Sequence, residues 1–72
     1  MRLGNKIPLL LQLYHFDVQM PEQGFVVLTL IDKTTGKFTA FEAKTWGKCV
    51  DLAFAFMNRE LKKNMAQTIN NN

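Results

Sequence analysis

The chain has 72 residues, of which 47% are hydrophobic and 21% charged, and its net charge is +3. A chain this short holds one domain at most, and its composition is that of a folded protein and not of a disordered tail. The single cysteine, Cys49, excludes a disulfide within the chain. Because there is also no CxxC pair and no histidine cluster, we expect neither a metal site nor another cofactor.

The segment from Pro8 to Met20 predicts a first antiparallel strand, because aromatic and β-branched residues alternate in it: Tyr14, Phe16 and Val18. A helix is the alternative for its first half. The leucines between Pro8 and Tyr14 are good helix formers, and Pro8 suits the first turn of a helix. The stretch from Pro21 to Gly24 has the composition of a turn and separates this segment from the next one.

The strongest local pattern is a β-hairpin. Phe25 to Asp32 and Lys37 to Ala43 are both rich in β-branched and aromatic residues, and the short loop Lys33-Thr34-Thr35-Gly36 joins them. Gly36 can adopt a positive φ at the end of this loop, as hairpin loops often require. We therefore predict two paired antiparallel strands here.

From Thr45 onward the apolar spacing changes to that of a helix. Thr45 can cap its start, and basic residues near its end suit the helix dipole. The apolar positions recur every three or four residues: Trp46, Cys49, Val50, Ala53, Phe54, Met57 and Leu61. The last eight residues, 65–72, turn polar, and we predict a frayed tail after a single domain of residues 1–64.

These elements together predict an α+β fold, in which a three-stranded antiparallel β-meander packs against one long C-terminal α-helix, in the order β-β-β-α. Only one face of such a sheet lies against the helix, so the other face of a monomer should be polar. Here both faces carry apolar residues. The expected pairing places eight of them together on the face away from the helix: Tyr14, Phe16, Val18, Phe25, Val27, Ile31, Phe38 and Ala40. Five of these are candidates for binding: Tyr14, Phe16, Phe25, Val27 and Phe38.

The predicted helix has the same surplus, because Asp51 is the only polar residue between Cys49 and Met57. Leu52 and Phe56 are expected to point away from the sheet. Contiguous apolar patches on small proteins mark interaction sites, so we predict that these two residues and the five on the sheet bind a partner. The alternative is that the leucine-rich N-terminus folds back as a helix over the second face of the sheet.

The positive charges are spread along the chain, and only a weak basic edge is expected. Lys33 and Lys37 flank the hairpin tip, while Lys44 and Lys48 flank the start of the helix. These four lysines support an alternative function, the binding of nucleic acid through its phosphates. No arrangement of residues indicates catalysis, since His15, Asp17 and Cys49 lack the partner groups that an active site needs. We therefore expect no enzyme.

The layout from Phe25 to Leu61 resembles the arm-type DNA-binding domains of phage and transposon integrases, which are three-stranded sheets with one C-terminal helix. Two segments carry the resemblance, the hairpin loop Asp32 to Lys37 and the helix entry Lys44-Thr45-Trp46. The sheet face that reads DNA in those domains is polar and basic, whereas here it is apolar. The size and build are also similar to those of small phage proteins that block a host enzyme or a defence complex, which implies an inhibitor or anti-defence function.

The sequence thus predicts a non-catalytic protein-binding module, either a homodimeric small regulator or a phage-type inhibitor that occupies a partner's surface. The predicted partners are a second copy of the chain, a host protein or a host complex. No apolar stretch reaches the roughly 20 residues that cross a bilayer, and no cleavable signal is recognisable, so a cytoplasmic location without membrane contact is expected.

Overall fold

A computed structural model describes residues 2–21 and 24–70 of the chain, with side chains up to residue 64. Its elements are α1 (Leu3–Leu13), β1 (Tyr14–Gln19), β2 (Val26–Asp32), β3 (Phe38–Ala43) and α2 (Trp46–Asn70). The three strands form one antiparallel sheet in the order β1-β2-β3. The predicted α+β fold with a long C-terminal helix is confirmed, and α1 is an addition to it.

The N-terminal half of the predicted first strand is wrong. Residues 8–13 belong to α1, and the strand begins only at Tyr14. Pro8 lies inside α1 beyond its first turn, where it removes one hydrogen bond of the helix. Burial outweighs that loss, because helical spacing brings Leu10 into the core with no exposed surface while Ile7 packs beside it. The alternative helix in this segment is therefore correct.

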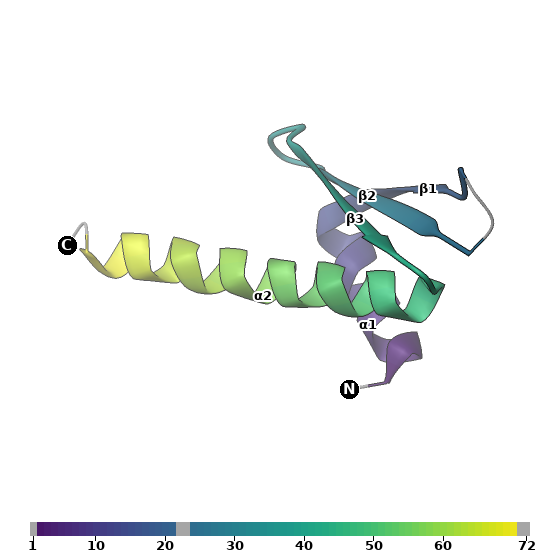
Figure 1. Cartoon of the computed structure of the whole chain (residues 1–72). Coiled ribbons are helices and arrows are strands. Elements are labelled where there is room, and N and C mark those ends of the chain that lie inside the picture. The colour runs from purple at the N-terminus through teal and green to yellow at the C-terminus, as the bar shows by residue number, and fades with distance from the viewer. Residues whose placement is uncertain (1, 22–23, 71–72) are drawn as a thin grey trace.

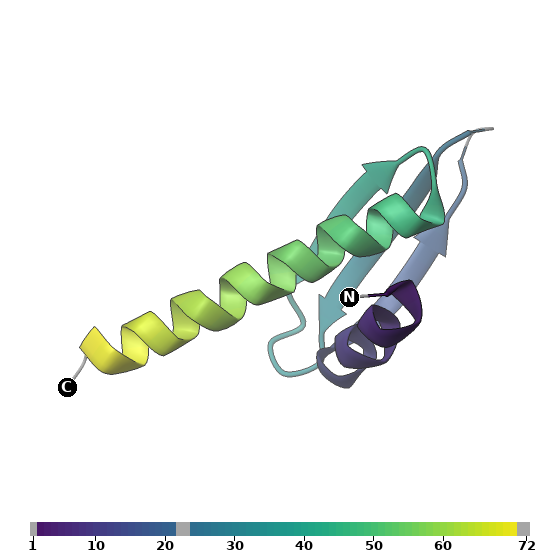
Figure 2. The ribbon, with the colours of Figure 1, turned by 90° about the horizontal axis from the view of Figure 1, so that it is seen from below.

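Both helices cover the same face of the sheet (Figures 1 and 2). In Figure 2, seen from below, α1 and α2 lie side by side in front of the strands. The core lies between the sheet and the two helices. Every helix and strand except β3 contributes to its buried residues, which are Leu10, Tyr14, Val26, Leu28, Leu30, Cys49, Val50, Ala53 and Met57. The alternative in which an N-terminal helix covers the second face is thus wrong, because α1 packs against α2 on the first.

The predicted hairpin is confirmed in its strands and its loop. Residues of β2 pair antiparallel with β3 from Val26↔Ala43 to Ile31↔Phe38. One carboxylate oxygen of Asp32 accepts hydrogen bonds from the backbone N–H groups of Thr34 at 2.7 Å and Thr35 at 3.0 Å. Gly36 has φ 78°, the left-handed conformation that a residue with a Cβ adopts at a cost. Residues 22 and 23 of the predicted turn lie outside the described residues.

The register between β1 and β2 differs from the expected one. Phe16 pairs with Leu30 and Val18 with Leu28, so the side chains of β1 that were expected on the uncovered face point toward the helices. Side chains alternate along a strand, and a shift of one residue in the pairing therefore exchanges the two faces completely. Tyr14, Phe16 and Val18 belong to the covered side of the sheet.

The helix α2 starts as predicted and extends well past the sheet. The hydroxyl oxygen of Thr45 accepts a hydrogen bond of 3.2 Å from the N–H of Lys48, which is an N-cap. The helix projects from the body, and the molecule measures 49 × 26 × 17 Å along its principal axes (Figure 1). Its backbone is helical up to Asn70, including residues 65–70 of the predicted tail, while residues 71 and 72 lie outside the described residues.

One ion pair joins the two helices. The ammonium of Lys6 lies 2.7 Å from a carboxylate oxygen of Asp51 and 5.5 Å from the ring centre of Phe54. A single cation on α1 thus contacts two residues of α2 and links the two helices. Neither helix, over its described residues, has the combination of length and apolar composition that a membrane crossing requires.

Candidate interaction surface

The face of the sheet opposite both helices, here called the outer face, carries nine side chains from the three strands. The central strand contributes Val27, Thr29 and Ile31, β1 contributes His15, Asp17 and Gln19, and β3 contributes Phe38, Ala40 and Glu42. No described helix or strand covers this face (Figure 1). The three side chains of β2 keep some exposure even though they are flanked on both sides.

The apolar part of the outer face lies over β2 and β3. Phe38 is 76% exposed and stands directly opposite Ile31 in the sheet, so the two side chains form one cross-strand pair. Val27 follows on the same face of β2, and Phe25, 37% exposed, lies just before that strand. A phenylalanine as exposed as Phe38 is unusual where it adjoins other apolar groups, and such patches mark interaction sites.

Polar residues border this apolar area. All three outer-face residues of β1 are polar, and Glu42 closes the other side at the end of β3. Thr29 separates Ile31 from Val27 along β2, so the apolar pair of Phe38 and Ile31 lies at one end of the outer face. Protein–protein interfaces combine such an exposed apolar cluster with polar residues around it.

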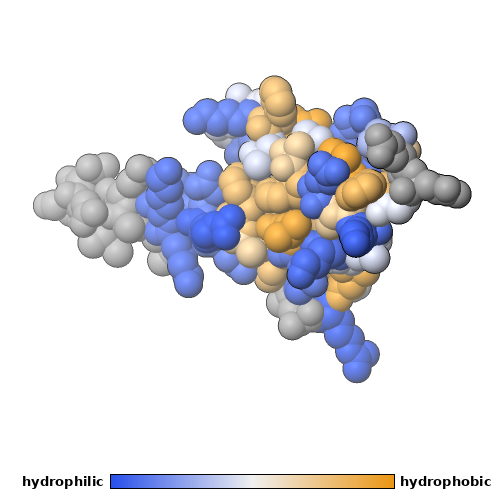
Figure 3. All heavy atoms as spheres, in the orientation of Figure 1, coloured by the Kyte–Doolittle hydropathy of each residue, from blue (hydrophilic) through white to orange (hydrophobic). Residues whose placement is uncertain are grey.

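A second apolar area lies where α2 passes the end of β3. Leu52 of α2, 38% exposed, lines a shallow depression of about 410 Å³ together with Ala43, Lys44 and Lys48. Figure 3 shows hydrophobic residues gathered over the body, where α2 and β3 lie in Figure 1, and hydrophilic residues along the projecting part of α2. This area adjoins the free edge of β3.

The structure separates the predicted partner-binding residues into two groups. Val27 and Phe38 lie on the outer face, Phe25 next to it, and Leu52 beside β3. The other three are turned inward: Tyr14, Phe16 and Phe56.

The inward group forms aromatic contacts inside the molecule. The ring of Phe56 lies 6.4 Å from that of Tyr14 and 5.6 Å from that of Phe41, so Phe56 does not point away from the sheet as expected. Phe16 meets Trp46 edge to face at 6.1 Å. These three residues are therefore removed from the candidate surface.

The lysines predicted for nucleic-acid binding do not form one patch. Lys33 and Lys37 lie at one end of β3 and Lys44 and Lys48 beyond the other, roughly 20 Å away at the rise of a strand. The ammonium of Lys33 is already used, because it donates a hydrogen bond of 2.6 Å to the carbonyl oxygen of Leu11. A phosphate chain would thus meet two separate pairs of charges instead of one basic stripe.

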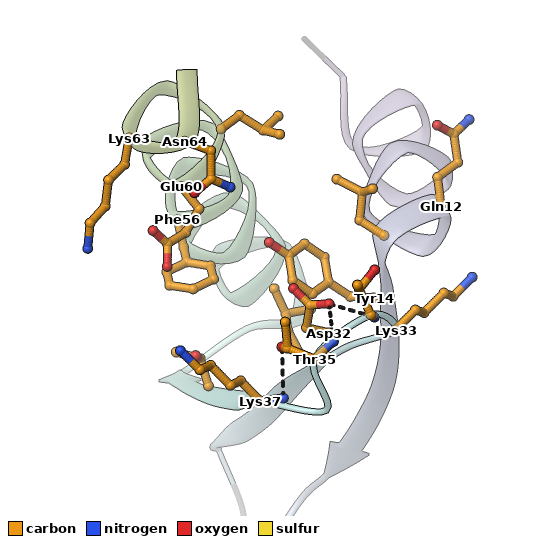
Figure 4. A pocket seen from close by; sticks show the side chains of 15 residues that line it. Gln12, Tyr14, Asp32, Lys33, Thr35, Lys37, Phe56, Glu60, Lys63 and Asn64 are labelled. Carbon is orange, nitrogen blue, oxygen red and sulfur yellow. Dashed lines mark hydrogen bonds between the residues drawn. The ribbon is translucent and has the colours of Figure 1, made fainter. Parts of the chain in front are cut away.

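A mixed cavity of about 580 Å³ opens between the hairpin loop and α2 (Figure 4). Phe56 and Glu60 reach toward it from α2, and Tyr14 and Asp32 from the sheet. Burial raises the pKa of the Tyr14 hydroxyl above its usual 10.0, and the nearby carboxylates of Asp32 and Glu60 raise it further. Lys33 and Lys63 point away on opposite sides, so the cavity offers no converging set of cations.

The thiol of Cys49 is part of the core. It is fully buried, and its S–H donates to the carbonyl oxygen of Val26 at 3.2 Å, with the carbonyl of Phe41 at 3.6 Å. Burial among apolar groups is typical of a structural cysteine. Over the described ranges, no three His, Cys, Asp or Glu side chains lie close enough together to hold a metal ion.

No family model matches the sequence, and comparison with curated proteins and with solved structures gives no significant match.

Two features of the surface could not be found from residue spacing. The first is the set of exposed leucines on α1, namely Leu9, Leu11 and Leu13. They were missed because this segment was predicted as a strand and is a helix. The second is the free backbone edge of β3, which depends on how the sheet ends and not on side-chain type. A correct register between β1 and β2 would have shown that β1 is polar on the outer face.

Proposed function

We propose that this chain is a non-catalytic protein-binding module that acts by covering a partner protein's surface with the outer face of its sheet. In this proposal it is a small regulator or inhibitor, of the kind that phage inhibitors represent, and it associates with itself as well as with its target. Its cytoplasmic location is part of the same proposal.

The observation that carries the proposal is the exposure of Phe38 on a face that both helices leave open. Burying one such side chain contributes about 1.5–3 kcal/mol, and it adjoins Ile31, which would be buried with it. Aromatic anchors of this type dominate the binding energy of many interfaces. Because both helices lie on the same side of the sheet, the outer face stays exposed. A partner that covers this face gains the free energy of burying these side chains.

The charge distribution favours a protein partner over nucleic acid. The two charged residues of the outer face, Asp17 and Glu42, are both acidic and would repel phosphates. The four lysines lie as two separate pairs at the two ends of β3. Association through the outer face should therefore persist at moderate salt, whereas phosphate binding would weaken steeply.

A photo-crosslinking amino acid placed at residue 38 tests this proposal in the cells that express the chain. The matched control carries the same amino acid in place of Leu9, another exposed apolar residue, on α1. We expect a protein adduct from position 38 that survives high salt, and none of the same mass from position 9. An absence of adducts at position 38, or the same adducts from both positions, would refute binding through the outer face.

A further inference from the structure

We propose that the free edge of β3 binds the β3 edge of a second copy, so that two sheets join into one. This inference deepens the proposed function, on which it rests, because the edge borders the same outer face.

The alternation of these bonds identifies which groups of β3 face outward. The N–H of Asp32 donates to the carbonyl of Lys37 at 2.8 Å, so these two residues are a hydrogen-bonded pair. In an antiparallel ladder every second pair is bonded, which assigns the bonds to Thr39, Phe41 and Ala43 on β3. The backbone groups of Phe38, Ala40 and Glu42 therefore point away from β2.

The opposite edge of the sheet supports this assignment. The N–H of Lys33 donates to the carbonyl of Leu13 at 3.1 Å, and by the same alternation Tyr14 points its backbone out of the sheet. Its N–H is in fact taken by the carbonyl of Leu10 at the end of α1. The β1 edge is thus partly closed by the chain itself, whereas no described element bonds to the outward groups of β3.

The β3 strand also lacks the features that normally prevent edges from pairing. Its sequence contains no proline, its register with β2 is continuous without a bulge, and Glu42 is its only charged residue. Natural proteins protect exposed edges with such devices. An unprotected edge flanked by the exposed side chains of Phe38 and Leu52 is suited to strand addition.

The outward groups of β3 are complementary to themselves about a two-fold axis. When Ala40 lies opposite Ala40 of the second copy, Phe38 lies opposite Glu42 in both directions, and each of these pairs exchanges two N–H···O bonds. The register places no like charges opposite each other, because each Glu42 meets a phenylalanine. The two outer faces become continuous, and this symmetry favours a second copy over an unrelated strand.

Introducing a charge at residue 40 tests the register directly. The side chain of Ala40 is exposed, so Ala40→Lys and Ala40→Glu should leave helix content unchanged while placing like charges opposite each other at the axis. We expect the unmodified chain to have the mass of a dimer at high concentration, and each variant that of a monomer, with the dissociation constant raised about tenfold or more. An equimolar mixture of the two variants should recover the dimer.

Disulfide trapping gives a second measurement that does not depend on charge. An Ala40→Cys chain should form a crosslinked dimer on mild oxidation, since Cα atoms of a bonded antiparallel pair lie about 5.5 Å apart. The control, Asp17→Cys, is exposed on the other edge strand and should stay monomeric, while Cys49 is buried in both.

Two results would overturn the proposal: an unmodified chain that is monomeric at every concentration, or a dimer that neither Ala40 variant weakens. Either result leaves the crosslinking from residue 38 to a target protein unaffected, so the binding of a target and the association through β3 fail separately. A monomeric chain whose β3 edge takes up an extended segment of a different protein counts against the second copy.

Discussion

The ammonium nitrogen of Lys33 lies 2.6 Å from the carbonyl oxygen of Leu11 and donates a hydrogen bond to it, 22 residues away along the chain. The backbone N–H of Lys33 also donates to the carbonyl of Leu13. The last carbonyl groups of a helix have no partners within the helix. The hairpin loop therefore satisfies the C-terminal end of α1 and fixes where the helix changes into β1.

Replacing Lys33 by methionine should lower the free energy of unfolding by about 0.5–1 kcal/mol, because the bond to Leu11 is lost at an exposed site while the aliphatic stem is kept. Urea unfolding followed by circular dichroism measures the change. Lys37→Met is the matched control, since the ammonium of Lys37 makes no hydrogen bond within the described residues. Equal losses in both variants would contradict a capping role for Lys33.

The same contact shows why the first element was only half predictable. Between Pro8 and Leu13 the leucines favour a helix, whereas the alternating residues that follow from Tyr14 favour extending the strand backwards. These two tendencies are of similar size. The outcome is decided by tertiary contacts, namely the burial of Leu10 against α2 and the capping by Lys33. Neither contact is local, so spacing along the chain could not reveal them.

The candidate surface was predictable where it depends on local pattern. The hairpin loop fixes the register of β2 and β3, which placed Val27, Phe38 and Ile31 on one face correctly. The register of β1 depends on a longer connection, which constrains pairing less than a tight turn does. The error in the predicted register of β1 placed Tyr14 and Phe16 on the wrong face. The predicted excess of exposed apolar side chains is present in the structure.

The ion pair between Lys6 and Asp51 should make stability fall in acid. The hydrogen bond from Lys6 lowers the pKa of the Asp51 carboxyl below its usual 3.8, against a smaller opposing effect of burial. A carboxyl whose pKa is lower in the folded chain than in the unfolded chain stabilises the fold at pH values above the unfolded pKa. This stabilisation is lost as the pH falls through the folded pKa. Asp51→Asn should therefore weaken the fold at neutral pH and show less additional loss below pH 3.8 than the unmodified chain.

NMR titration of the Asp51 carboxyl measures the shift directly. In Lys6→Met the pKa should return toward 3.8, because the largest cause of its lowering is removed. An unchanged pKa in that variant would show that the contact between α1 and α2 does not form as described. Asp17→Asn, on the outer face of β1, serves as the control for general effects of losing a carboxylate.

Tyr14 should make the fold sensitive to alkali. It is the only tyrosine, so the ultraviolet absorbance of phenolate reports on it alone. Its pKa is raised by burial and then by Asp32 and Glu60, so the unfolded chain loses the proton first as pH rises. The stabilisation from the protonated Tyr14 hydroxyl is complete below pH 10.0, its ordinary pKa. It disappears as the pH rises through the higher pKa of Tyr14 in the folded chain. Glu60→Gln should lower the pKa toward 10.0, and a native titration at or below 10.0 would contradict the burial of this hydroxyl.

Phe38 and Leu30 provide a final contrast between binding and folding. Leu30 is buried between the sheet and the helices, and Leu30→Ala should cost about 2–5 kcal/mol through the cavity that it leaves. Phe38 is 76% exposed, and Phe38→Lys should change stability by no more than about 0.5 kcal/mol. If Phe38 serves a partner instead of the fold, that variant loses crosslinking from neighbouring position 31 while it unfolds at the same urea concentration. A loss of several kcal/mol in Phe38→Lys would mean that the outer face is covered in the folded state and is not an open binding surface.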